Sequence, residues 1–108
     1  MFLMKLARRK RSADQSSSIA TIPDYDPSGL SEFQRLHARL GKRVALYLPS
    51  EIEARFVRFS NPDLLAKTNS QATLAQLRRS ESTAVRRVVE MIDRHNAGLE
   101  QEALLIQV

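Results

Sequence analysis

Apolar and polar residues alternate over residues 43–48, and this is the clearest pattern in the chain. The apolar side of the alternation holds Val44, Leu46 and Leu48. The other side holds Arg43, Ala45 and Tyr47. A period of two predicts a half-buried strand, and Pro49 ends it because proline has no N–H to give to a β-ladder. A strand needs a partner and no second alternating run of similar quality is found, so we expect a second copy of the chain to supply it.

A short helix is predicted directly after this strand, over residues 50–59. Ser50 is a suitable N-cap, and Glu53, three residues later, completes a capping box. Ile52 and Phe56 then fall on one face of the helix at helical spacing. The Asn-Pro-Asp sequence that follows breaks the helix, because a residue before proline disfavours helical backbone.

A longer helix is predicted to begin at the serine-rich residues 80–83, where Ser80 or Ser82 can accept hydrogen bonds from the first turn. An apolar stripe follows at helical spacing, made of Val85, Val88, Val89 and Ile92. Asn96 and Gly98 provide the stop. We expect the stripe to pack into the core, because an amphipathic helix buries its apolar face.

The remaining segments give weaker signals. Two further amphipathic patterns, over residues 30–40 and 71–79, predict helices. The tail over residues 99–108 has several apolar positions and is compatible with a short strand, a docking segment or a frayed end. We therefore divide the chain into an arm and linker (residues 1–29), a folded domain (residues 30–98) and this tail.

The chain is strongly basic for its length, and this narrows the partners that we expect. It has 108 residues, a net charge of +5 and a sequence pI near 10.2. A basic balance favours a polyanion, with nucleic acid before an anionic membrane surface. No apolar run approaches the roughly 20 residues needed to cross a bilayer, and the lack of cysteine fits a reducing cytoplasm. A core of this size is marginal alone, which favours a homodimer.

The N-terminal arm is expected to be disordered, because its basic cluster and the serine-rich run behind it offer little apolar surface. The cluster consists of Lys5, Arg8, Arg9, Lys10 and Arg11. It is either an arm that binds DNA phosphates or a solvated tail, and the sequence leaves both interpretations open.

No arrangement of residues predicts catalysis, so we expect no catalytic residue. The chain has no glycine-rich phosphate loop, no carboxylate pair set against a base and no Ser/His/Asp spacing. Its two histidines, His37 and His95, lie far apart without an acidic or cysteine cluster near either, which argues against a metal site. We also expect no cofactor.

A strand, a capped helix and a serine-opened helix on a basic chain resemble the ribbon-helix-helix (MetJ/Arc-type) family of DNA-binding proteins. Residues 43–51 resemble the ribbon and the start of its first helix, and residues 80–89 resemble the second helix. The resemblance covers roughly residues 42–96, about half the chain. It implies a mostly α-helical homodimer with an intermolecular two-stranded antiparallel β-ribbon, preceded here by a flexible N-terminal arm. The ribbon of that family lies in the major groove of DNA.

The resemblance also assigns roles to individual positions. The positions that would contact bases are Arg43, Ala45 and Tyr47. The positions that would contact phosphates, at or near the start of the second helix and of the ribbon, are Lys42, Arg78, Arg79, Ser80, Ser82 and Thr83. The dimer core would consist of Val44, Leu46, Leu48, Ile52, Phe56, Val85, Val88, Val89 and Ile92.

Two features depart from the family pattern. The family joins its helices by a short connection, whereas residues 60–79 separate them here. In addition, Ala45 stands where a hydrogen-bonding side chain is more usual.

The expected function is sequence-specific binding of duplex DNA, as a bacterial cytoplasmic repressor or autoregulator or as an accessory of plasmid maintenance or transfer. Two alternatives stay open. One is a protein-interaction module, such as an antitoxin or a secretion or conjugation adaptor, that docks a partner through residues 99–108. The other alternative concerns the fold: residues 43–48 would form an ordinary strand in a small α+β domain.

Overall fold

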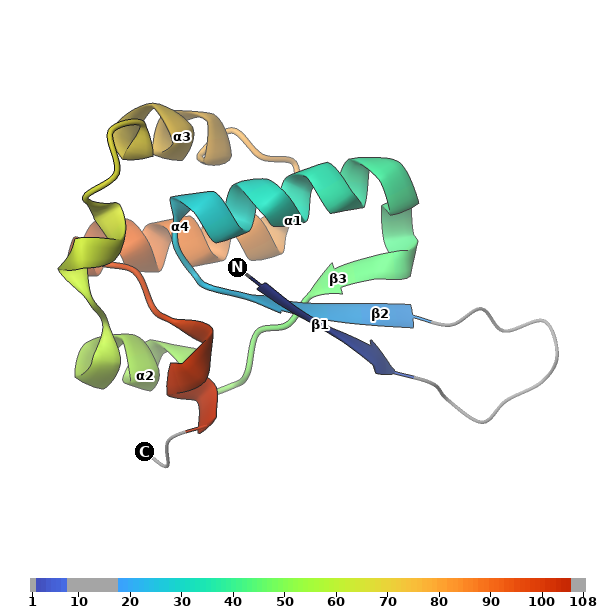
Figure 1. Cartoon of the computed structure of the whole chain (residues 1–108), viewed down its shortest axis with the longest axis horizontal. Coiled ribbons are helices and arrows are strands. Elements are labelled where there is room, and N and C mark those ends of the chain that lie inside the picture. Colours follow the sequence, from blue (N-terminus) through green and yellow to red (C-terminus); the bar gives the residue numbers. More distant parts are fainter. Residues whose placement is uncertain (1, 8–17, 106–108) are drawn as a thin grey trace, which may run out of the picture.

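The computed structural model describes residues 2–7 and 18–105. Its strands and helices are, in chain order, β1 (Phe2–Ala7), β2 (Ser18–Pro23), α1 (Pro27–Leu40), β3 (Val44–Leu46), α2 (Ile52–Phe59), α3 (Ser70–Leu77) and α4 (Thr83–His95) (Figure 1). Short 3₁₀ turns lie at Gly41–Arg43, Pro62–Leu65 and Gln101–Leu105. The predicted mostly helical class is confirmed. Within the described part, no helix is both long enough and apolar enough to cross a membrane.

The three strands form one sheet in the order β1-β2-β3. β1 and β2 are antiparallel, with Lys5 opposite Ala20, and β2 and β3 are parallel, with Ala20 opposite Ala45. The expectation that a second copy supplies the partner of β3 is therefore wrong for one edge of that strand, because β2 of the same chain lies there. The sequence analysis missed residues 18–23 because their apolar alternation is short and follows a polar run.

The structure also corrects part of the expected disordered arm and linker. β1 and β2 lie within residues 1–29, and α1 begins at Pro27, earlier than the predicted boundary at Leu30. Of the basic cluster, Lys5 falls within β1, whereas Arg8, Arg9, Lys10 and Arg11 lie outside the described residues. The physical reason is the third strand: two strands that are marginal alone gain stability when they join a larger sheet.

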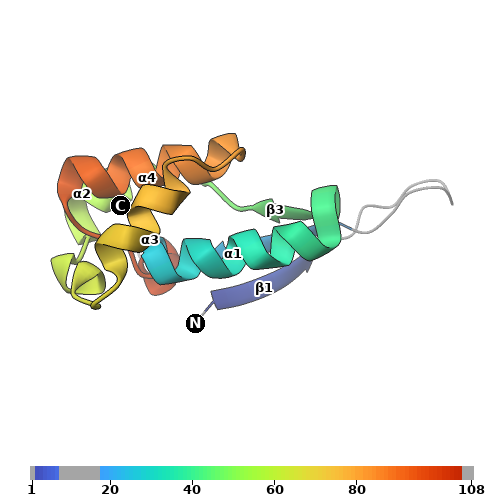
Figure 2. The same cartoon turned by 90° about the horizontal axis from the view of Figure 1, so that it is seen from above.

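Helix α1 runs along the sheet and links it to the other helices (Figures 1 and 2). It packs on β2, β3 and α3. The Asp26 carboxylate caps its first turn by accepting a hydrogen bond from the Gly29 amide at 2.7 Å. A Cβ at Gly29 would lie 2.0 Å from the Asp24 carbonyl oxygen, so only glycine fits this close approach. At its other end α1 is followed by Gly41, whose φ of 63° favours glycine.

The core forms where α1, α2, α4 and the inner face of β3 meet. Eight of the predicted core residues are buried, namely Val44, Leu46, Ile52, Phe56, Val85, Val88, Val89 and Ile92. Leu48 is half-buried against them. Packing within a single chain accounts for this burial. Sequence analysis did not place Tyr25 and Leu99 in the core, although both are fully buried.

The helix boundaries confirm the predicted start of α4 and correct that of α2. Ser82 caps α4 by accepting a hydrogen bond from the Val85 amide at 3.2 Å. The predicted capping box of Ser50 and Glu53 does not form, because Glu51 is the N-cap of α2 and its side chain makes no capping bond. Glu53 instead forms an ion pair with Arg94 of α4.

The C-terminal tail docks on its own chain as far as the structure describes it. The Tyr25 amide donates to the Leu99 carbonyl at 2.7 Å, and the Leu99 amide donates back to the Tyr25 carbonyl at 3.0 Å. Ala103 is buried, and its carbonyl accepts a hydrogen bond from Arg55 Nη1 at 2.7 Å. Leu105 is exposed. The described tail is therefore anchored to the fold through Leu99 and Ala103.

Candidate nucleic-acid interface

Strand β3 spans Val44–Leu46 and is shorter than the predicted strand over residues 43–48, because Arg43 belongs to the preceding 3₁₀ turn and Tyr47 follows the strand. The predicted alternation of burial is present across this stretch, since Val44 and Leu46 are buried whereas Arg43, Ala45 and Tyr47 are exposed. A buried side chain fixes the backbone at Tyr47, because the Tyr25 hydroxyl donates a hydrogen bond to the Tyr47 carbonyl at 2.6 Å. Burial raises the pKa of the Tyr25 phenol, with a smaller contribution from Tyr47, so this donor keeps its proton. The three predicted base-contacting positions thus share one exposed, anchored stretch of chain.

The outer edge of β3 keeps free backbone groups. The Tyr47 amide donates to the Thr21 carbonyl at 2.9 Å, so the backbone groups of Ala45 and Tyr47 point toward β2. In a parallel ladder the backbone groups of the intervening Leu46 then point away from β2. β3 is also the last strand of the sheet among the described residues. This edge can accept one more strand over a short length.

A groove of about 500 Å³ lies between the end of α1 and the start of α4. From the first side it is lined by Phe33, Gln34, His37, Ala38 and Lys42. From the second side it is lined by Ser80, Glu81 and Ser82. The fold thereby brings three of the six predicted phosphate-contacting residues, Lys42, Ser80 and Ser82, around one space.

The first turn of α4 follows directly after the serines that line this groove, and two of its amides are free. The Ser80 hydroxyl accepts from the Ser82 amide at 3.1 Å, and Ser82 caps the Val85 amide. The amides of Thr83 and Ala84 have no acceptor among the described residues. A helix start with free N–H groups and a positive dipole end favours an anion. Glu81 is the one acidic residue in the lining, and its charge opposes that of Lys42.

The other predicted phosphate contacts lie elsewhere or contribute differently. Arg78 forms a bidentate ion pair with Asp93 of α4, in which its Nε and Nη2 donate to the two carboxylate oxygens at 3.0 and 2.8 Å. This contact raises the pKa of the Arg78 guanidinium. Arg79 is exposed and does not line the groove. Thr83 begins α4, and its hydroxyl accepts a hydrogen bond from Arg86 at 3.5 Å. Arg78 therefore has a carboxylate partner already, whereas Arg79 remains open to solvent.

Two residues of the interface were missed by sequence analysis. His37 lines the groove and lies against the Phe33 ring, with the ring centroids 5.7 Å apart. Arg86 donates to the Ser80 carbonyl and so holds the turn that precedes α4. The helical spacing of Phe33 and His37 was visible in the sequence, but their approach to α4 depends on tertiary packing. Within the described ranges, no group of three or more His, Cys, Asp or Glu side chains could hold a metal ion.

Comparisons with protein-family models, with curated proteins and with solved structures find no match to this chain. The candidate interface consists of the exposed side chains in and around β3 and of the groove between α1 and the start of α4.

Proposed function

We propose that this chain binds duplex DNA and that the groove between α1 and α4 holds one of the DNA phosphates. The observation that carries the proposal is the meeting of Lys42 with Ser80 and Ser82 around the groove. Lys42 would supply a positive charge, and the start of α4 would supply free N–H groups and the positive end of its dipole. The net charge of +5 supports a polyanionic partner.

The exposed face of β3 would then read the bases. Arg43 follows the proposed phosphate-binding Lys42 directly, so a phosphate held in the groove keeps this strand close to the duplex. A guanidinium can form two hydrogen bonds with a guanine, and a tyrosine hydroxyl can donate to a base or a phosphate. Ala45 can contact only an apolar group such as a thymine methyl. Sequence readout would therefore depend most on Arg43.

The proposed DNA-binding form is a homodimer joined through the free edge of β3. Two identical edges related by a two-fold axis pair antiparallel, and each buries the backbone groups of the other. This arrangement is that of the ribbon-helix-helix family, with β2 added on the far side of each strand. Repression, autoregulation and a role in plasmid maintenance or transfer would all use this surface.

The test is a salt titration of DNA binding with matched lysine variants. Wild type, Lys42→Gln and Lys67→Gln are compared by fluorescence anisotropy on a mixed pool of duplex DNA. Lys67 is a suitable control because it carries the same charge and lies outside the groove. We expect Lys42→Gln to reduce the slope of log affinity against log salt by about 0.9 for each copy bound. Lys67→Gln should leave the slope unchanged.

Two outcomes would contradict the proposal at different points. Equal loss of slope in both variants would mean that charge alone, and not the groove, attracts the DNA. A wild-type protein indifferent to DNA at low salt would reject DNA binding altogether. Sedimentation of the same samples tests the dimer, because a monomer with the full salt slope would exclude the β3 edge as the dimer contact.

A further inference from the structure

The outer edge of β3 is short, and few of its backbone groups are available to a second strand. The Tyr47 amide donates to β2, so the amide and carbonyl of Leu46 point away from β2. These two Leu46 groups have no hydrogen-bond partner among the described residues. The Val44 amide is already used, because it donates to the Gly41 carbonyl. Within β3, only Leu46 therefore offers both a donor and an acceptor to a partner strand.

The side chains on the core side of this stretch restrict the register of two identical antiparallel strands. Val44 and Leu46 are buried, and Leu48 is half-buried on the same side. If Leu46 lies on the two-fold axis, Val44 of each copy lies opposite Leu48 of the other, and the two Leu46 residues face each other. Each apolar position then meets an apolar position, which is the condition that sets the register of a half-buried strand.

A shift of the axis removes this match in either direction. With the axis one residue earlier, Leu48 would lie opposite the exposed Lys42 of the partner. With the axis one residue later, Val44 would lie opposite the exposed Ser50 of the partner. An axis between two residues would set backbone groups that point outward against groups that point toward β2. The pattern therefore favours Leu46 as the residue on the axis.

The same register uses the backbone groups that are available. The two Leu46 residues exchange amide-to-carbonyl hydrogen bonds across the axis, as a hydrogen-bonded antiparallel pair does. The Leu48 amide has no acceptor in the described part of the chain, and it can donate to the Val44 carbonyl of the partner. The bond in the opposite direction does not form, because the Val44 amide is held by Gly41. The ribbon is therefore short and ends where the turn before β3 begins.

On the exposed side, this register places Tyr47 of each copy opposite Ala45 of the other. The two positions form a non-hydrogen-bonded pair, in which the Cα atoms lie about 4.5 Å apart. The Tyr47 side chain is 43% exposed, and a neighbour as small as alanine leaves room for its ring. A short side chain at Ala45 is therefore suited to a position that a partner's tyrosine covers.

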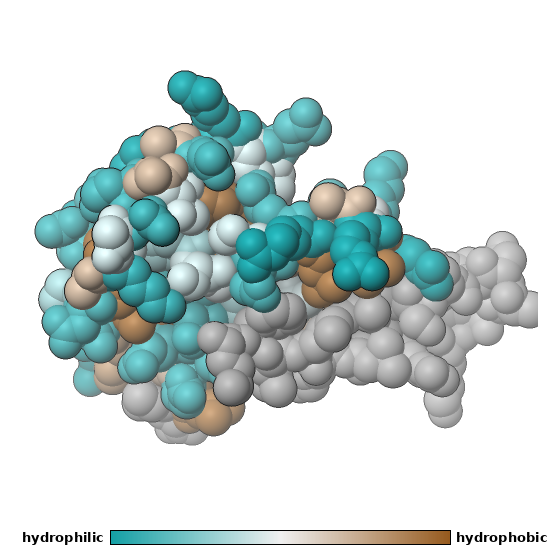
Figure 3. Space-filling model, turned by 45° about the horizontal axis from the view of Figure 1, so that its top comes forward, coloured by the Kyte–Doolittle hydropathy of each residue, from teal (hydrophilic) through white to brown (hydrophobic). Residues whose placement is uncertain are grey.

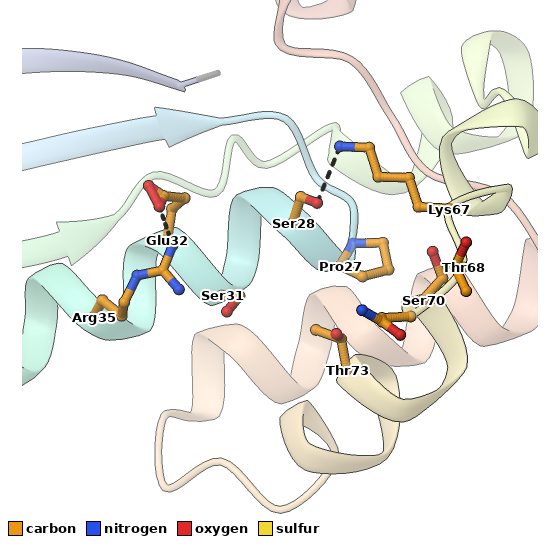
Figure 4. Close-up of a pocket in the computed structure, with 10 residues that line it drawn as sticks. Pro27, Ser28, Ser31, Glu32, Arg35, Lys67, Thr68, Ser70 and Thr73 are labelled. Carbon is orange, nitrogen blue, oxygen red and sulfur yellow. Dashed lines mark hydrogen bonds and ion pairs between the residues drawn. The ribbon is translucent and has the colours of Figure 1, made fainter.

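The face that carries α1 and α3 is less suited to a second copy. It is covered mainly by hydrophilic and weakly polar side chains (Figure 3). A cleft of about 430 Å³, here called the α3 cleft, lies where the first turn of α1 faces the start of α3 (Figure 4). Its lining includes the hydroxyl-bearing residues Ser28, Ser31, Thr68, Ser70 and Thr73. The Nζ of Lys67 donates to the Ser28 hydroxyl at 3.2 Å across this cleft. Such a surface has little apolar area for the core of a dimer interface.

We propose that Leu46 lies on the two-fold axis of the dimer and that the partner's Tyr47 completes each base-reading face beside Ala45. The inference rests on the proposed homodimer and adds its register. Arg43 and Ala45 of one copy then share a surface with Tyr47 of the other, so one copy alone carries only part of the site. The two-fold symmetry of this surface fits a DNA site made of two inverted repeats.

The test is disulfide cross-linking of the full chain, which has no cysteine of its own. Ala45→Cys and Tyr47→Cys are produced separately and also co-expressed, then oxidised in a glutathione buffer and analysed by non-reducing electrophoresis. We expect a disulfide-linked dimer only in the co-expressed sample, because the proposed register sets these two positions at a separation that suits a disulfide. Gln76→Cys, exposed on α3, is the control for random collisions.

A cross-linked dimer in either single variant would overturn the register, because it would place that residue on the axis, and it would leave the proposed homodimer intact. No cross-link above the Gln76→Cys background in any sample would also overturn it. Sedimentation of the unmodified chain then separates the two proposals, since a monomer would contradict the homodimer as well. Both substituted side chains are exposed, so the variants should fold, and thermal unfolding curves check this.

Discussion

The two ends of α1 carry two related clefts that differ in how their helix starts are completed. Each faces the beginning of a later helix, each contains serines, and each has one lysine, Lys42 at one end and Lys67 at the other. The first turn of α4 has a serine cap from its own chain, whereas the side chain of Asn69 leaves that of α3 uncapped. The α4 groove includes Lys42, two residues before the start of β3.

This difference bears on the proposed DNA interface. The α4 groove belongs to an extended surface with an exposed strand, which suits a long polyanion held at several points. The α3 cleft is lined mainly by hydroxyl-bearing side chains from the start of α1 and from residues at the start of α3. Each of the two helix starts has two amides without an acceptor among the described residues, so the starts differ mainly in the elements next to them.

The largest expected effect on stability comes from truncating a buried side chain of α1, the helix whose two ends carry the clefts. Leu30 of α1 is fully buried, so Leu30→Ala should lower the free energy of unfolding by about 2–5 kcal/mol. Urea unfolding measures this change. Leu40→Ala on the same helix is the comparison, and it should lower stability clearly less than Leu30→Ala because Leu40 is 37% exposed whereas Leu30 is fully buried. Equal losses of stability in the two variants would mean that α1 does not pack on the core through Leu30.

A smaller effect should distinguish the capped helix start from the uncapped one. Ser82→Ala removes the bond to the Val85 amide and should cost about 1 kcal/mol in the free energy of unfolding. Asn69→Ala should cost little, because Asn69 makes no capping bond. Denaturant unfolding of both variants in parallel is the measurement. A loss in Asn69→Ala as large as that in Ser82→Ala would contradict the difference between the two ends.

The smallest effect concerns pH and the carboxylate that starts α1. Burial raises the pKa of Asp26 above its ordinary 3.8, although the Gly29 amide acts in the opposite direction. The folded state then binds its proton more tightly than the unfolded state does. Asp26 therefore adds stability at low pH, and this contribution is lost as pH rises from 3.8 through the folded-state pKa.

Asp26→Asn should remove this pH dependence and keep the cap, since asparagine is an equally good N-cap residue. The measurement is the free energy of unfolding of both proteins at several acidic pH values. The advantage of wild type over the variant should shrink as pH rises. An advantage that grows with pH would show that the hydrogen bond from Gly29, and not burial, dominates the pKa of Asp26.

Local patterns predicted the elements whose partners lie near in sequence. The alternation of β3, the stripe of α4 and the Ser82 cap depend on neighbouring residues, and the structure contains all three. The strand β2 and the burial of Tyr25 and Leu99 were not predicted, because they depend on contacts between segments far apart in the chain. The Ser50–Glu53 capping box does not form, because α2 begins at Ile52 with Glu51 as its N-cap, and Glu53 pairs with Arg94 of α4.

The candidate site was predictable in part. Charge and the serine-rich start of α4 indicated Lys42, Ser80 and Ser82, which the fold does bring together. Sequence could not indicate that Arg78 would pair with Asp93, because that contact joins two elements through their tertiary arrangement. The α3 cleft gave no sequence signal, since serine and threonine are common in loops and only their convergence makes them distinctive.

The mutual hydrogen bonds of Tyr25 and Leu99 have a consequence for how the chain is made. A ribosome releases Tyr25 long before it has added Leu99, so a growing chain holds a large aromatic ring without its cover. Contacts between such distant residues also slow folding, because a long loop must close first. We therefore expect the burial of Tyr25 to be a late step in folding, because it must wait until residue 99 is in place.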